Sequence, residues 1–148
     1  MNNHPYLRAY LAGVFVTTLI LPLMLTAFIV LRIVLQLPVP IERGLIFPMA
    51  LVPAVWGLWN MLWLASRART HVNVGVHGAL LPFLLLPCGA LAARCLGVLQ
   101  LGATGITWFQ SFSLPYALIG TGFCFGIAAY YLVWKYVVGF VNCELGIA

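Results

Sequence analysis

Charged residues are scarce in this chain of 148 residues. Only 6% of the residues are charged and 64% are hydrophobic, whereas about a quarter of an ordinary soluble domain is charged. So few polar side chains cannot cover a globule of this size, and this excludes a soluble fold. We therefore predict an integral membrane protein with a single domain over residues 1–148.

Acidic residues are especially few: the chain has two, against seven lysines and arginines, which gives a formal net charge of +5. The cations stand singly at the edges of apolar runs, where they can meet lipid headgroups. They form no clustered basic face, so we exclude nucleic acid as a partner. Both acids lie outside the apolar runs, so the sequence lacks the membrane carboxylate that proton-coupled exchange needs.

The chain also lacks closely paired cysteines and histidines. Its four cysteines form no C-x-x-C pair, which departs from the pattern of membrane thiol oxidoreductases. His4 lies near the N-terminus, and His71 and His77 lie in a polar segment over residues 67–78, at no strong zinc spacing. We predict solvated loop histidines and no cofactor. A redox or metal-binding membrane protein that uses these three histidines is the third interpretation of function.

Long apolar runs are what the sequence has in abundance. Residues 9–31, 45–65 and 114–134 contain no charge, and a helix over the first run is about 34 Å long, enough to cross the hydrocarbon core. With a further crossing between residues 74 and 101, these runs predict an all-α four-helix transmembrane bundle. Prolines inside the runs predict kinked helices. Residues 102–113 are expected to form a loop.

The third crossing has two possible registers, because Arg94 interrupts its apolar run. A helix over residues 74–93 leaves Arg94 at the interface, and a helix over residues 79–101 places it inside the membrane. Insertion energies allow both, since the nine leucines of the longer register, at about 0.5 kcal/mol each, outweigh the roughly 2.5–3.5 kcal/mol cost of a central arginine.

Four crossings place both termini and the polar segment over residues 67–78 on one side of the membrane. That side carries four cations, and the opposite side carries three, or two if Arg94 lies inside the membrane. The excess favours a cell-membrane location with both termini in the cytoplasm.

Polar residues within the apolar runs form one candidate site. Arg94 and Asn60 are candidates for lining an intramembrane cavity, and Glu42 lies on the side where it could pair with Arg94. Such a site would suit an anion or a lipid headgroup. The alternative is that Arg94 extends to the headgroups and is only an anchor.

Two further sets of residues are suited to helix packing. Trp56, Trp59 and Trp63 recur at helical spacing with Asn60, so this face either packs on a neighbouring helix, with Asn60 as a hydrogen-bonding cross-link, or stacks on a flat cofactor or a cation. Small residues at every fourth position of the third and fourth crossings allow close approach within the bundle, to a second copy or to another subunit; these are Gly89, Ala93, Gly97, Gly122 and Gly126.

No set of ionisable groups converges as catalysis requires, so the sequence favours a protein that is not an enzyme. We predict a non-catalytic accessory or structural subunit of a membrane assembly, with the lipid bilayer and a second copy or a larger complex as its partners. The alternative function is a small transporter or lipid-handling protein whose cavity is lined by Arg94 and Asn60.

Overall fold

Helices make up most of the computed structural model, which describes residues 4–36, 47–109 and 112–147. Among these residues, three continuous helical segments are long and apolar enough to cross a membrane: Pro5–Ile33, Val74–Cys95 and Tyr116–Glu144. The predicted class, a mostly helical chain with apolar spans, is therefore confirmed. The elements are α1 (Pro5–Ile33), α2 (Phe47–Thr70), α3 (Val74–Cys95), α4 (Tyr116–Leu132), the π-helical turn η2 (Val133–Val138) and α5 (Gly139–Glu144).

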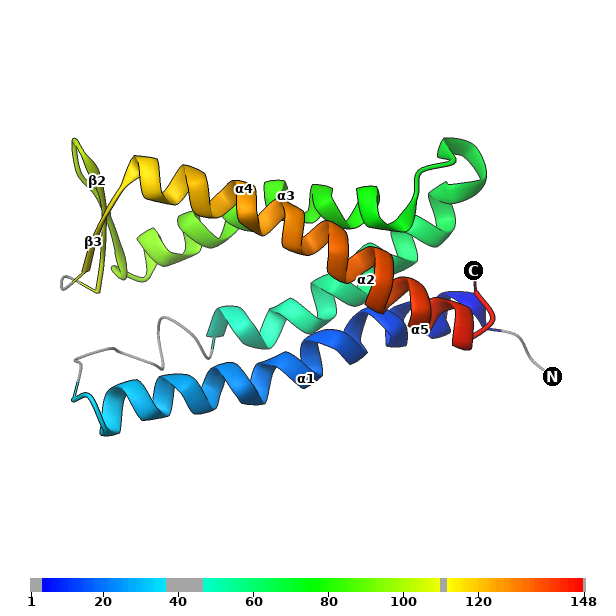
Figure 1. Ribbon diagram of the computed structural model, residues 1–148, viewed down its shortest axis with the longest axis horizontal. Coiled ribbons are helices and arrows are strands. Elements are labelled where there is room, and N and C mark those ends of the chain that lie inside the picture. The colour runs from blue at the N-terminus through cyan, green and yellow to red at the C-terminus, as the bar shows by residue number, and fades with distance from the viewer. Residues whose placement is uncertain (1–3, 37–46, 110–111, 148) are drawn as a thin grey trace.

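The helices form two antiparallel pairs, α1 with α2 and α3 with α4 (Figure 1). The pairs meet at the end of the molecule that holds both termini and diverge toward the other end (Figure 1). The main core lies where they meet, because Val16, Trp56, Leu81, Trp134 and Val138 come from all four helical segments and are buried together. Among the described residues, the two helix pairs are thus packed together toward one end and are apart toward the other.

The turn between α2 and α3 is shorter than the predicted polar segment over residues 67–78. It contains only residues 71–73, since α2 continues to Thr70 and α3 begins at Val74. Asn73 caps α3, and its Oδ1 accepts a hydrogen bond of 2.8 Å from the Gly75 N–H. This early cap places His77 in the first part of a helix rather than in a loop.

The structure has the shorter register for the third helix. α3 ends at Cys95, and Gly97 follows with a φ of +69°, a left-handed conformation that glycine adopts easily just beyond a helix end. Arg94 therefore lies in the last turn of α3, where its side chain is exposed. This position suits a cation, because the carbonyl end of a helix carries partial negative charge.

The prediction of a loop over residues 102–113, and with it a purely all-α fold, is wrong. A three-stranded antiparallel sheet in the order β1-β2-β3 occupies this region, formed by β1 (Leu99–Leu101), β2 (Gly105–Trp108) and β3 (Phe112–Pro115). Ile106, Thr107 and Trp108 favour a strand, and the three-residue connection from β1 to β2 contains Gly102. A small second core of Ala93, Val98 and Leu99 joins this sheet to the end of α3.

Interior prolines do not end the helices in which they lie. α1 continues through Pro22, α2 through Pro53, and α3 through Pro82 and Pro87. Near the first of these, the Thr26 hydroxyl donates a 2.8 Å hydrogen bond to the Pro22 carbonyl. This is a local bond from a helical threonine to the carbonyl four residues earlier, whereas the carbonyl that Pro22 leaves without an N–H partner is that of Thr18.

Candidate functional site

Asn60 is the centre of a buried hydrogen-bond network, which we call the asparagine network. Its Nδ2 donates to the Ala9 carbonyl oxygen at 2.8 Å and to Asn142 Oδ1 at 2.8 Å. Asn142 Nδ2 donates back to Asn60 Oδ1 at 3.1 Å. Both asparagine side chains are fully buried. Asn60 thus forms the interhelical hydrogen bonds that the sequence predicts, and it connects α1, α2 and α5.

The tryptophan face of α2 packs against neighbouring parts of the chain. The Trp56 ring lies 5.2 Å from the Tyr130 ring and 5.3 Å from the Trp134 ring, measured between centroids. Trp59 Nε1 donates to the His77 carbonyl oxygen at 2.9 Å, and Trp63 Nε1 donates to the carbonyl oxygen of Val72 at 3.0 Å. In the described part of the chain, this face therefore makes helix-packing contacts.

His77 is not a solvated loop histidine, and that prediction is wrong for this residue. Its side chain is only 8% exposed, and its ring stacks on Trp59 with 4.8 Å between the centroids. His77 Nε2 lies 3.0 Å from the Trp59 carbonyl oxygen, which can only accept, so Nε2 carries a proton. His77 Nε2 thus donates to the Trp59 carbonyl, while Trp59 Nε1 donates to the His77 carbonyl, so two hydrogen bonds join α2 and α3.

The other two histidines are exposed, as predicted. His4 precedes α1, and His71 lies in the turn between α2 and α3 with a φ of +50°. Within the described ranges, no three His, Cys, Asp or Glu side chains come close enough to hold a metal ion. The candidate metal-binding set is therefore divided, because only His77 is in the core.

The structure does not bring Arg94 to Asn60. His77 lies beside the α2 tryptophans near Asn60, and Arg94 follows it seventeen positions later on the same helix, which at 1.5 Å per residue is about 25 Å away. Glu42, the third member of the predicted polar site, lies outside the described residues. The two described residues of that site are therefore far apart: Asn60 lies on α2 near the first part of α3, and Arg94 lies at the end of α3.

The predicted glycine stripes are not the places where helices approach closely within this chain. A Cβ placed on Gly89, Gly122 or Gly126 would meet no described atom within 4 Å, and Gly97 ends α3 rather than lying on its face. Ala93 is buried, but against the region of the sheet. The faces that carry Gly89, Gly122 and Gly126 are thus open.

Close approach instead occurs at four glycines near the packed end. A Cβ on Gly13 would lie 2.5 Å from the Trp56 carbonyl oxygen, and one on Gly78 would overlap the Trp134 side chain. The remaining two, Gly57 and Gly75, contact side chains of α1 and of the α4–η2 segment. One of these positions had a signal in the sequence, since Gly13 follows Ala9 by four residues as in small-xxx-small packing.

Two arginines hold the C-terminal residues against the packed end. Arg8 Nη1 donates to the Leu145 carbonyl oxygen at 3.2 Å, and Arg67 Nη1 donates to the Ile147 carbonyl oxygen. These carbonyls follow the end of α5, where helix carbonyl groups lack partners within the helix. Both cations therefore make a structural contact within the protein, which the prediction of topology anchors did not include.

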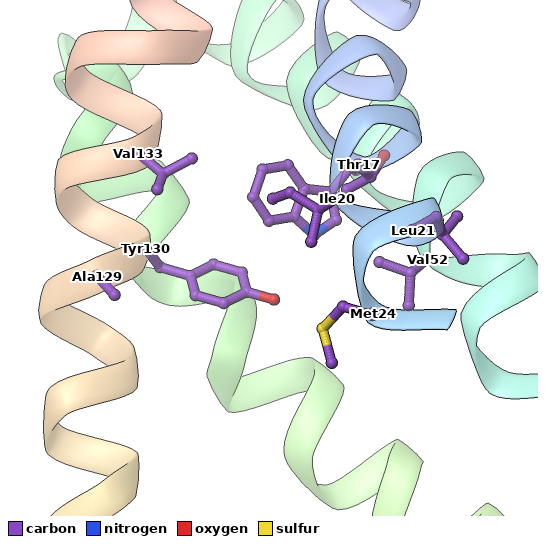
Figure 2. A pocket seen from close by; sticks show the side chains of 9 residues that line it. Thr17, Ile20, Leu21, Met24, Val52, Ala129, Tyr130 and Val133 are labelled. Carbon is purple, nitrogen blue, oxygen red and sulfur yellow. The ribbon is translucent and has the colours of Figure 1, made fainter. Parts of the chain in front are cut away.

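A cavity of about 330 Å³ lies where the two helix pairs separate (Figure 2). α1 supplies Thr17 and Met24, α2 supplies Trp56, and the α4–η2 segment supplies Tyr130 and Val133. The Tyr130 hydroxyl points from α4 into the space opposite Met24 (Figure 2). Sequence reasoning missed this cavity, because its walls are ordinary apolar residues from three distant segments.

Searches against family models, curated proteins and solved structures find no match to this chain.

Proposed function

We propose that this chain is a non-catalytic structural subunit of a membrane assembly. In this proposal it crosses the cell membrane four times, with both termini in the cytoplasm, and it pairs with a second copy or with another membrane protein. The observation that carries the proposal is the open α3–α4 surface, where glycine positions suited to close helix contact have no neighbour among the described residues.

The apolar character of the open half supports the membrane part of this proposal. Large apolar side chains there are well exposed, including Phe125 at 74% and Leu91 at 64%. Water would disfavour such a surface, whereas lipid tails or a partner helix would accept it. Polar side chains have the opposite distribution, because the asparagine network is buried inside the packed end.

The contacts of α2 support a crossing by this helix in addition to the three long apolar segments. α2 has 24 residues, so it is about 36 Å long, and it packs along α1. Asn60, its most polar interior residue, has hydrogen-bond partners within the described part of the chain, and so has the Trp59 indole N–H. A helix whose buried amide is satisfied in this way can cross between apolar neighbours.

The test is the size of the particle that mild detergent extracts from the native membrane. Light scattering after size-exclusion chromatography is expected to show a complex larger than one chain, and Gly122→Leu with Gly126→Leu is expected to reduce it to the monomer. Gly120→Leu is the matched control, since Gly120 is also an open glycine of α4 but lies on another side of the helix. A wild-type chain that is a stable monomer would contradict the proposal.

A further inference from the structure

The cavity between the helix pairs lies at the middle of the apolar helices, and the inference drawn from this depth rests on the proposed membrane crossing. Thr17 and Met24 flank the centre of the 29-residue helix α1, and Tyr130 is the central residue of the 29-residue segment Tyr116–Glu144. If these segments cross the bilayer, the cavity is close to its midplane. Water is not available there to satisfy polar groups.

A buried donor and an adjoining hydroxyl lie together at this depth. Trp56 is 4% exposed, and its Nε1 has no hydrogen-bond acceptor among the described residues. The adjoining Tyr130 directs its hydroxyl into the cavity (Figure 2). The Trp56 side chain is also a hydrogen-bonding neighbour of this hydroxyl. Because an indole N–H can only donate, the Tyr130 oxygen would accept it, which leaves the hydroxyl proton for an acceptor in the cavity. Without such an acceptor, apolar surroundings penalise the hydroxyl.

The remaining walls are apolar and are open on one side. Ile20 and Met24 line the cavity and are 41% and 39% exposed, so a molecule could enter sideways from the lipid. The volume of about 330 Å³ is at the lower end of the roughly 300–1,000 Å³ found for small-molecule sites. The flexible thioether of Met24 can adapt to the shape of an occupant.

We propose that this cavity binds a free apolar carbonyl compound of the quinone type. Its ring carbonyl would accept the Tyr130 hydroxyl proton, and its apolar part would lie against Met24 and Val133. Depth distinguishes this occupant from a phospholipid, because the ester carbonyls of a phospholipid lie at the edge of the hydrocarbon core, about 15 Å from its centre. The proposal concerns binding alone.

The test uses the full chain in phosphatidylcholine vesicles, with decyl-benzoquinone as the probe. We expect the probe to quench tryptophan fluorescence with a saturable component. Decyl-benzene, which has the chain and ring but no carbonyl, is expected not to compete. A phospholipid occupant is present in every vesicle, so absence of saturable quenching by the quinone would assign the cavity to an acyl chain and overturn the proposal.

Two pairs of neighbouring variants localise the effect. Ala129→Phe fills the cavity, whereas Ala128→Phe makes the same change on an exposed residue outside the lining. Saturable quenching is expected to be lost in the first and kept in the second. Tyr130→Phe is expected to raise the apparent Kd about five-fold, the effect of one hydrogen bond of about 1 kcal/mol, whereas Tyr131→Phe is expected to leave it unchanged.

Equal quenching in Ala129→Phe and the wild type, or an unchanged Kd in Tyr130→Phe, would contradict the proposed site. Circular dichroism of all four variants checks that each is folded. Alkaline extraction of the same vesicles separates the two proposals. A chain that alkali removes is not inserted, and both proposals then fail; an inserted chain without saturable quenching refutes only the quinone site.

Discussion

Asn60 and Asn142 donate side-chain hydrogen bonds to each other although they are 82 positions apart in the sequence. Asn60 Nδ2 also donates to the Ala9 carbonyl oxygen, so both of its hydrogens are used. A buried polar network in which every member is satisfied fixes one arrangement of helices, because any shift leaves an amide unpaired in apolar surroundings.

Replacing Asn60 with alanine is expected to destabilise the folded state by about 1–3 kcal/mol, because it leaves the buried Asn142 side chain without its partner and removes the bond to the Ala9 carbonyl. The double variant Asn60→Ala with Asn142→Ala is expected to lose less than the sum of the two single changes. Chemical unfolding in micelles measures both, with Gln100→Ala as an exposed control. Strictly additive losses would show that the two amides are not coupled.

Glycine substitutions on α3 are expected to separate its packed half from its open half. Gly78→Ala places a methyl group against the Trp134 ring and is expected to cost at least about 1–3 kcal/mol. Gly89→Ala meets no described atom and is expected to stabilise the helix by up to about 1 kcal/mol through helix propensity. Thermal unfolding of the two variants in the same detergent tests this difference, and equal effects would contradict the packing at Gly78.

The three histidines are expected to differ in chemical reactivity. Diethyl pyrocarbonate should modify the exposed residues His4 and His71 in the folded protein, whereas His77 should react only after unfolding, because it is stacked under Trp59 and bonded to its carbonyl. Peptide mapping by mass spectrometry gives the extent at each position. Rapid modification of His77 in the folded chain would mean that its helix contacts are not kept.

Arg67 and Arg69 provide a matched pair for the C-terminal contacts. Arg67→Leu removes the donor to the Ile147 carbonyl and is expected to speed amide hydrogen exchange over residues 143–147 several-fold. Arg69 is exposed in the same last turn of α2, and Arg69→Leu is expected to leave this exchange unchanged. A similar acceleration in both variants would show a general effect of charge and not a specific hydrogen bond.

The sequence predicted the apolar helices well, because run length and the absence of charge depend on neither partners nor packing. It left the position of Arg94 open, since apolarity alone allowed both registers, and the Asn73 cap with the left-handed Gly97 decides between them. It missed the sheet because strands of three or four residues are too short for a periodic pattern to stand out.

Predictions about the candidate site were less successful, because they depend on which helices pack together. Periodicity shows which residues share a face, but it does not show what that face meets. The tryptophan face was identified and its neighbours were not, and the glycines that contact other helices, such as Gly78, are not those that recur most regularly. The buried position of His77 required the location of the turn before α3, which a single asparagine cap determines.

The asparagine network also constrains biogenesis. α1 and α2 emerge from the ribosome long before Asn142 does, so a growing chain holds Asn60 with the Ala9 carbonyl as its available partner within the network. The network can be completed only once the fourth helix and its continuation have been synthesised. A chain truncated before Asn142 is therefore expected to be an immature form in which the Asn60 amide lacks one of its partners.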